Sequence, residues 1–176
     1  MNAHDLVFID EAGVNLAMSA LQAWAPKGQR AYGAAPKNWG DNITLIAGVS
    51  LGGQVAPWML RRSMDGDAVL TWVETQLAPT LRAGQVVVMD NLSVHKRDGV
   101  RAAIEARGAR LLFLPPYSPD LSPIEPAWSK IKHLVRKAAA RSWVALLDAV
   151  AHAMRAVVPK DALGWFRHCG YWVQLT

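Results

Sequence analysis

Five short apolar runs predict the β-strands of this chain. They cover residues 6–10, 43–51, 54–60, 85–90 and 110–114. The first and fourth runs are almost wholly apolar, as is typical of strands in a sheet covered on both faces, and they end on Asp10 and Asp90. The second and third runs flank Gly52 and Gly53, a pair that favours a tight hairpin turn. These two strands should therefore be antiparallel neighbours.

Four further stretches carry apolar residues at steps of three and four and predict amphipathic helices. They cover residues 67–81, 93–107, 123–140 and 143–157. Ser142 can cap the last helix, which should end before Pro159. Residues 12–41 contain several glycines and prolines and predict an irregular excursion with a short strand near Trp24. The aromatic segment 164–172 is expected to fold back onto the domain.

The order of these elements predicts an α/β fold. An antiparallel hairpin follows the first strand, and two strand-helix-strand units come after it, which together call for a mixed five-stranded sheet. The first three strands should be antiparallel, and the first, fourth and fifth should be parallel. The helices should cover both faces of this sheet.

Composition agrees with a single domain that spans residues 1–176. Hydrophobic residues make up 52% of the chain, which is enough for a sizeable core. No apolar run has the length of a membrane span and no signal peptide is evident, so we expect a cytoplasmic protein without a membrane partner. One cysteine, Cys169, excludes an internal disulfide and a metal site built from several cysteines.

Positive charge is concentrated after Glu125. The net charge is +5; residues 126–176 contain eight Lys or Arg against two acids, whereas residues 1–125 contain 11 against 12. Four of these cations lie in the predicted helix 123–140, which has no acid after Glu125: Lys130, Lys132, Arg136 and Lys137. A helix that faces a polyanion has this pattern, and so does a solvated helix face. The charges alone leave both interpretations open.

Glu125 also has two competing interpretations. Prolines keep residues 115–119 extended, so a helix begins no earlier than Ser122. Ser122 is a good N-cap, and Glu125 three residues later completes a capping box, in which the glutamate only caps. Alternatively, Glu125 lies close to Asp10 and Asp90. If the strands that end on these aspartates are parallel neighbours, both aspartates lie at the same edge of the sheet, and Glu125, on the helix after the next strand, can lean toward them.

Three acids at one edge of a sheet indicate a divalent metal site. Carboxylates placed close together repel one another, and a cation relieves this repulsion. Carboxylates without a set of His or Cys partners favour hard ions such as Mg²⁺ or Mn²⁺. Two such ions, roughly 3.5–4 Å apart, are the usual device for in-line attack at a phosphodiester.

Three blocks of the sequence resemble the catalytic blocks of DDE transposases. They are Phe8-Ile9-Asp10-Glu11, Met89-Asp90-Asn91-Leu92-Ser93-Val94-His95, and the stretch from Leu114 to Lys132 that contains Ser118-Pro119-Asp120-Leu121-Ser122-Pro123-Ile124-Glu125. They are most similar to the mariner-type superfamily, in particular its bacterial insertion-sequence members, and the resemblance extends from residue 6 to about residue 158. It implies an RNase H-like fold, with Asp10, Asp90 and Glu125 as the catalytic and metal-binding triad.

The resemblance also implies a reaction and its partners. A DDE transposase cuts DNA strands at transposon ends, and the freed 3′-hydroxyl attacks target DNA. The implied partners are transposon-end DNA, target DNA and a second copy in a homodimeric complex, all associated with the bacterial nucleoid. Full-length relatives carry an N-terminal helix-turn-helix region, and this chain starts about five residues before the first predicted strand. A truncated reading frame, a frame-split one that works with a separate N-terminal DNA-binding polypeptide, and an isolated catalytic domain all fit this start. We expect weak DNA binding without sequence preference by this chain alone.

Several neighbours of the triad are also candidates for a role. His95 either contacts DNA or caps the helix that follows Asp90, and both interpretations stay open. Glu11 should point to the opposite face of the strand from Asp10, in a structural role, and Asp120 should brace its turn. We expect four cations to contact DNA phosphates: Lys130, Lys132, Arg136 and Lys137.

Two other functions use the same features. An inactive or domesticated derivative would keep only DNA binding or subunit contacts, but retention of all three acids argues against it. Another RNase H-like nuclease would use the same acids on RNA–DNA hybrids or junctions. The long block around Glu125 argues against that alternative.

Overall fold

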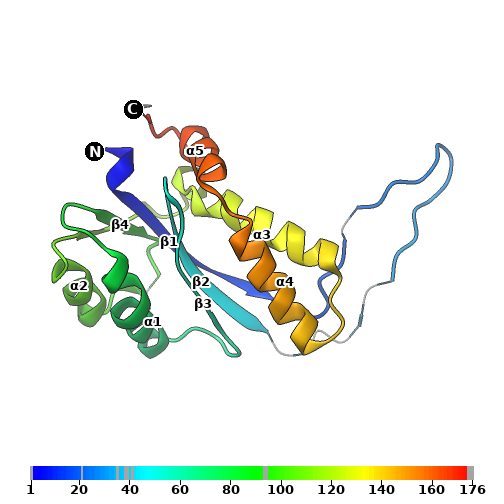
Figure 1. Cartoon of the computed structure of the whole chain (residues 1–176), viewed down its shortest axis with the longest axis horizontal. Coiled ribbons are helices and arrows are strands. Elements are labelled where there is room, and N and C mark those ends of the chain that lie inside the picture. Colours follow the sequence, from blue (N-terminus) through cyan, green and yellow to red (C-terminus); the bar gives the residue numbers. More distant parts are fainter. Residues whose placement is uncertain are drawn as a thin grey trace.

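A five-stranded sheet with the strand order β3-β2-β1-β4-β5 forms the centre of the molecule (Figure 1). The computed structural model describes residues 2–20, 22–34, 36–37, 40, 42–92 and 95–173. The strands are β1 (Leu6–Val14), β2 (Ile43–Ser50), β3 (Gly53–Leu60), β4 (Val86–Met89) and β5 (Arg110–Phe113). β1, β2 and β3 pair antiparallel, and β1, β4 and β5 pair parallel. The predicted mixed sheet is therefore confirmed.

The first strand is longer than the sequence predicted. Its pairing with β4 covers only Leu6 to Phe8, but on its other side it stays paired with β2 as far as Val14. Asp10 therefore lies within β1 and not at its end. β4 ends at Met89, so the edge of β1 that faces it has no strand partner at Asp10. A polar side chain can occur in β1 at that position.

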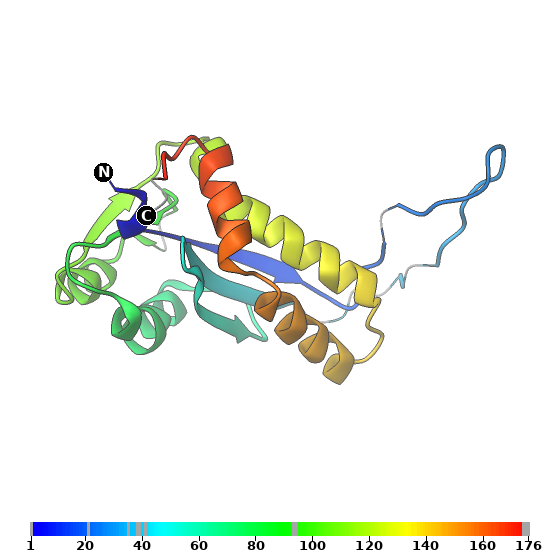
Figure 2. The ribbon, with the colours of Figure 1, turned by 45° about the horizontal axis from the view of Figure 1, so that its top comes forward.

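Helices cover both faces of the sheet, as predicted (Figures 1 and 2). One face carries α3 (Ile124–Ala138), α4 (Trp143–Arg155) and α5 (Pro159–His168), and the other carries α1 (Gly66–Trp72) and α2 (Asp98–Glu105). Side chains of β1 alternate between the two cores: Phe8 and Ala12 lie on the α3 face, whereas Val7 and Ile9 lie on the α1 face. None of the described helices is both long and apolar enough to cross a membrane.

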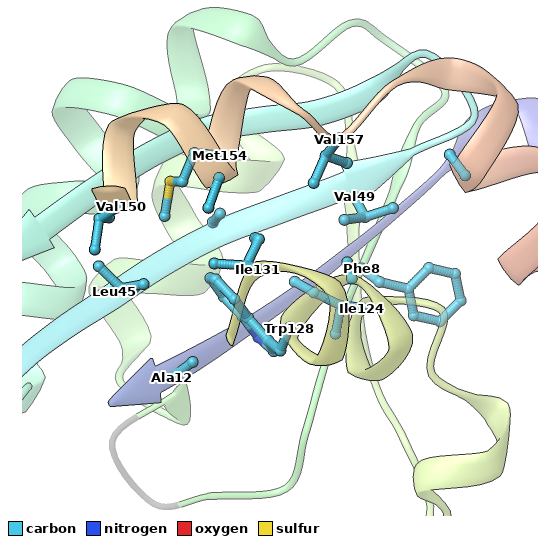
Figure 3. Packing of buried hydrophobic residues seen from close by; sticks show 14 of the residues in the cluster. Phe8, Ala12, Leu45, Val49, Ile124, Trp128, Ile131, Val150, Met154 and Val157 are labelled. Carbon is cyan, nitrogen blue, oxygen red and sulfur yellow. The ribbon is translucent and has the colours of Figure 1, made fainter. Parts of the chain in front are cut away.

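Helix α3 is fixed on the sheet by large buried side chains. Figure 3 shows Ile124, Trp128 and Ile131 turned toward the strands that carry Phe8 and Leu45. All five side chains are at most 3% exposed. Burial of an aliphatic side chain of this size contributes about 1.5–3 kcal/mol. The first turn of α3, which contains Glu125, is therefore held rigidly against β1.

The predicted helix 67–81 is one helical run with changing geometry. It begins as α1, continues through a π-helical segment, η2 (Val73–Leu77), and ends in a 3₁₀ segment, η3 (Ala78–Thr80). Pro79 has no N–H to donate to a preceding carbonyl, so regular α-helix cannot continue through it. The sequence therefore gave the position of this run but not its internal geometry.

Two other helices differ from the prediction. α2 begins at Asp98, not at residue 93, and residues 93 and 94 lie outside the described part of the chain. α5 was not predicted: Pro159 occupies its first turn, and the Asp161 carboxylate accepts a hydrogen bond from the Val158 N–H (3.0 Å). Phe166 of α5 packs edge-on against Phe8, with ring centroids 5.5 Å apart. The aromatic end thus folds back onto the domain, as expected.

The connection between β1 and β2 extends away from the sheet (Figures 1 and 2). Its residues 22–34 contain no helix or strand, so the predicted irregular excursion is confirmed. The prediction of a short strand near Trp24 is wrong. Trp24 is fully exposed and has neither a neighbouring strand nor a core to pack against.

Candidate active site

The pairing of β1 with β4 brings two aspartates to the same level of the sheet. Leu6 pairs with Val86 and Phe8 with Val88, and the same offset continued by two residues places Asp10 opposite Asp90. Asp10 has the same parity along β1 as Phe8, so its side chain lies on the face covered by α3. The strand pairing therefore brings both aspartates close to the first turn of α3, which contains Glu125.

Asp10, Asp90 and Glu125 line one pocket of about 420 Å³. One wall of this pocket is the proline-rich connection 114–119 between β5 and α3, and Asn91, Leu92 and Ser122 complete it. The prolines fix this connection in an extended path. The structure thus places the three predicted catalytic acids at one pocket: Asp10 lies within β1, Asp90 directly follows β4, and Glu125 lies in the first turn of α3.

Glu125 does not cap its helix. The N-cap of α3 is Pro123, without a side-chain hydrogen bond, and the Ser122 N–H donates to the Pro119 carbonyl (3.0 Å). Glu125 is exposed, and among the described residues its carboxylate has no hydrogen-bond partner. The capping-box interpretation is therefore wrong. The Ser122 N–H, which the Glu125 carboxylate would accept in a capping box, is bonded to the Pro119 carbonyl instead.

The electrostatics of Asp10 show that the acids affect one another. Burial raises its pKa, a hydrogen bond from the Glu11 backbone lowers it, and the charges of Glu11, Glu125 and Asp90 raise it further, to about 7. An ordinary aspartate has a pKa of 3.8. In the protein without metal, Asp10 thus carries an unfavourable charge above neutral pH.

His95 lies beneath the pocket and not on the surface. Its side chain is 0% exposed, its Nδ1 lies 2.6 Å from Asp90 Oδ1, and its Nε2 lies 2.9 Å from Glu11 Oε1. This position corrects the expectation that His95 contacts DNA, and it also excludes a cap of α2, which begins at Asp98.

Two carboxylates determine the protonation of His95. Both of its partners are carboxylate oxygens, so an imidazolium with two N–H groups satisfies both contacts. Burial lowers the pKa of His95, but the hydrogen bond and charge of Glu11 and the charge of Asp90 raise it to about 8. Glu11 therefore has a specific partner that the sequence did not reveal, because 84 residues separate it from His95.

The three carboxylates of Asp10, Asp90 and Glu125 are ligands of the kind that a hard divalent cation prefers. Their side chains do not converge on a single metal position in this structure. Among the described residues, no group of three His, Cys, Asp or Glu side chains is arranged to hold a metal ion together. Asp10, Asp90 and Glu125 nevertheless line the same pocket. Oxygen ligands of this kind fit Mg²⁺ or Mn²⁺.

The predicted DNA-contacting cations fall into two groups. Lys130 points into the protein: its Nζ donates to Asp161 Oδ2 (2.5 Å) and to the Ala156 carbonyl (2.8 Å). The expectation of a phosphate contact by Lys130 is thus corrected. Three cations of α3 have no ion-pair partner among the described residues: Lys132, Arg136 and Lys137.

Asp120 lies in a short 3₁₀ segment, η5 (Pro119–Leu121). It is exposed and does not line the pocket. This position agrees with a role in the turn and not in the site. Asn91, which follows Asp90, does line the pocket.

Comparison with known families gives one match that covers most of the chain. Residues 5–146 match the family described as DDE superfamily endonuclease. No curated protein sequence matches the chain.

Solved structures of the Mos1 mariner transposase share the fold. A pre-cleavage Mos1 transpososome aligns with a TM-score of 0.75 at 17% identity, over 97% of this chain and 54% of that chain. The Mos1 strand transfer complex gives 0.72 at 18% identity, over 96% and 51%. The Mos1 catalytic domain alone gives 0.66 at 14% identity, over 97% and 79%. The chain therefore has the predicted RNase H-like fold and spans about half the length of the Mos1 chains in the two complexes.

Proposed function

Because the chain belongs to the DDE superfamily of endonucleases, we propose that it is the catalytic domain of a mariner-type transposase of the bacterial insertion-sequence branch. In this function it cuts DNA strands at transposon ends and joins the freed 3′-hydroxyl to target DNA. One observation carries the proposal: Asp10 in β1, Asp90 just after β4 and Glu125 in α3 line a single pocket. The fold shared with Mos1 transposase complexes supports it.

Asp10, Asp90 and Glu125 would hold two divalent ions, Mg²⁺ or Mn²⁺. When bound, such ions activate an attacking oxygen and stabilise the leaving oxygen of a phosphodiester. The mutual repulsion that raises the pKa of Asp10 supports a cation at this place. Mos1 paired-end complexes solved with Mn and with Mg provide a precedent in a protein of the same fold.

The protein supplies positioning for this chemistry. Asp10 is held by β1, and its charge interacts with those of Asp90 and Glu125. The stiff wall 114–119 borders the pocket and limits how a DNA strand can lie against the acids. Rigid placement of this kind reduces the entropy lost when the reacting groups come together.

DNA and a second copy of the chain are the proposed partners. Lys132, Arg136 and Lys137 follow Glu125 on the same helix, and their charges suit the phosphate backbone. A homodimer in the active complex would allow two transposon ends to be processed together. The paired-end complexes of Mos1 are the precedent for this assembly.

Nicking of supercoiled plasmid in Mn²⁺ tests the proposed activity without requiring recognition of a particular end sequence. We expect the wild-type chain to convert plasmid to the open-circular form. Asp90→Asn should lower the rate at least about 100-fold, more than the loss of a residue that only supports a ligand. Gel electrophoresis of timed samples measures both rates.

Asp120→Asn is the matched control, since it makes the same chemical change at an exposed aspartate outside the pocket. We expect it to nick at the wild-type rate. Equal nicking by wild type and Asp90→Asn would contradict the proposed site. If the wild type binds DNA but never nicks it, the competing function, DNA binding without cleavage, replaces the proposal.

A further inference from the structure

A hydrogen-bonded chain of three side chains runs under the pocket from Glu11 through His95 to Asp90. Asp90 Oδ1 accepts two hydrogen bonds, from His95 Nδ1 (2.6 Å) and from the Leu92 N–H (3.1 Å). Among the described residues, Asp90 Oδ2 accepts none. The two oxygens of this carboxylate are therefore not equivalent, because one is bonded on the protein side and the other is free.

Glu11 holds the far side of the imidazole. Side chains alternate along a strand, so Glu11 lies on the face opposite Asp10, and its Oε1 contacts His95 Nε2 at 2.9 Å. The Glu11 side chain is only 14% exposed and does not line the pocket. A buried ring with both nitrogens bonded cannot turn without breaking a hydrogen bond, and breaking one in the interior is costly.

We propose that Glu11 and His95 are positioning residues for Asp90. They hold Oδ1 on the protein side, so that Oδ2 is presented to the pocket as the atom that binds metal. The inference rests on the proposed function, because it requires a metal centre in this pocket. Supporting residues that fix the orientation of a metal ligand commonly contribute 10–100-fold to metal affinity.

Two substitutions of His95 separate positioning from simple filling of space. Asparagine places its amide nitrogen near the position of Nδ1 and can still donate to Asp90. Glutamine places its amide nitrogen near Nε2 and can reach Glu11 but not Asp90. We expect Mn²⁺ affinity to fall about 10–100-fold in His95→Gln and to stay within roughly fivefold of wild type in His95→Asn. Electron paramagnetic resonance of free Mn²⁺ measures this affinity without any catalytic turnover.

A second pair of substitutions tests the hydrogen bond between Glu11 and His95 and leaves the buried imidazole unchanged. Glu11→Gln and Glu11→Ala both remove one negative charge, but only glutamine keeps an oxygen that accepts from Nε2. We therefore expect Glu11→Ala to bind Mn²⁺ at least about threefold more weakly than Glu11→Gln, a difference that charge alone cannot produce. Thermal unfolding of each variant confirms that it is folded at the temperature of the titration.

The outcomes distinguish this inference from the proposed function. Suppose that Asp90→Asn abolishes Mn²⁺ binding, while the two His95 variants bind Mn²⁺ equally and so do the two Glu11 variants. The metal site is then supported and the positioning role is refuted. If the two His95 variants lose affinity and thermal stability in parallel, His95 only fills space and the inference is also refuted. If the wild type binds no Mn²⁺, both the inference and the proposed function fail.

Discussion

At the scale of single residues, the site combines carboxylates that the fold holds at an energetic cost. Asp10 is partly buried beside Glu11, Glu125 and Asp90, and its pKa is raised to about 7. A raised carboxylate pKa means that the folded protein binds a proton more tightly than the unfolded chain. Folding is therefore opposed as the pH rises from about 4 to 7, and the full cost is present above pH 7.

Asp10→Asn should therefore stabilise the protein in the absence of metal. At pH 8 we expect a gain of about 2 kcal/mol, half the full value of such a shift because Asp10 is partly exposed, or roughly 4–8 °C in melting temperature. The gain should disappear below about pH 4, where the wild-type carboxyl is neutral in both states. Calorimetry at the two pH values, with chelator present, measures the difference. A lower melting temperature of the variant at pH 8 would show that the acids do not repel one another.

The sequence was informative for residues with strong local context and uninformative for contacts across the fold. Asp10 and Asp90 follow apolar runs, and Glu125 follows a run of prolines, so each position was evident locally. The contact of His95 with Glu11 joins residues 84 positions apart, and no local pattern reports it. The partner of Lys130 was missed for a related reason, because it belongs to α5, a helix that was itself not predicted.

At the scale of elements, α5 is fastened to α3 by a polar contact at its start. Lys130 bonds to Asp161, whose carboxylate also accepts from the Val158 N–H. Slight burial raises the pKa of Asp161, but the hydrogen bond from Lys130 and the one from Val158 outweigh it and hold this pKa below the usual range. A lowered carboxylate pKa contributes stability at neutral pH, which is lost as the pH falls through the folded-state value.

Asp161→Ala tests this contact. We expect the free energy of unfolding at pH 7 to fall by about 1–2 kcal/mol, a modest value because the carboxylate is partly exposed. The difference from wild type should shrink below pH 4, as the wild-type carboxyl takes up its proton. Urea titrations at pH 7 and pH 3 measure both values. Glu105→Ala, which breaks the exposed Arg101–Glu105 pair, is the control and should cost less than about 0.5 kcal/mol.

Element boundaries were less predictable than elements. β1 continues past Asp10 because β2 pairs with it there, and α2 begins at Asp98, after His95, whose imidazole contacts Asp90 and Glu11. Both deviations are set by tertiary contacts and not by local preference. α5 had a usable signal in Pro159 and Asp161, but the aromatic residues that follow obscured its helical spacing.

At the scale of the whole molecule, the order of elements determined the topology. One hairpin followed by two crossover units leaves few arrangements. In the observed strand order the connection from β3 through α1 passes β2 and β1 before β4 pairs with β1, whereas the connection through α2 joins the neighbours β4 and β5. The same topology sets the acids at one edge of the sheet and continues α3 away from them. The cations of α3 therefore lie on the element that carries Glu125.

DNA binding by this helix should depend on salt through the cations that are free of protein partners. We expect Lys137→Ala to reduce the slope of log affinity against log salt by about 0.9, the value for one lost phosphate contact. Lys130→Ala should leave the slope unchanged, since Lys130 is engaged by Asp161. Fluorescence anisotropy with a labelled duplex at several salt concentrations measures the slopes. A larger change for Lys130 than for Lys137 would reverse the assignment.

In the proposed function, Asp10, Asp90 and Glu125 bind divalent metal together. Anomalous scattering from crystals of the chain soaked in Mn²⁺ tests this proposal, because it locates the ion without a DNA substrate. We expect Mn²⁺ bound by Asp10 together with Asp90 or Glu125, and no Mn²⁺ in the pocket of Asp10→Asn crystals. Absence of Mn²⁺ from the wild-type pocket, or Mn²⁺ bound there without Asp10, would refute the proposed metal centre.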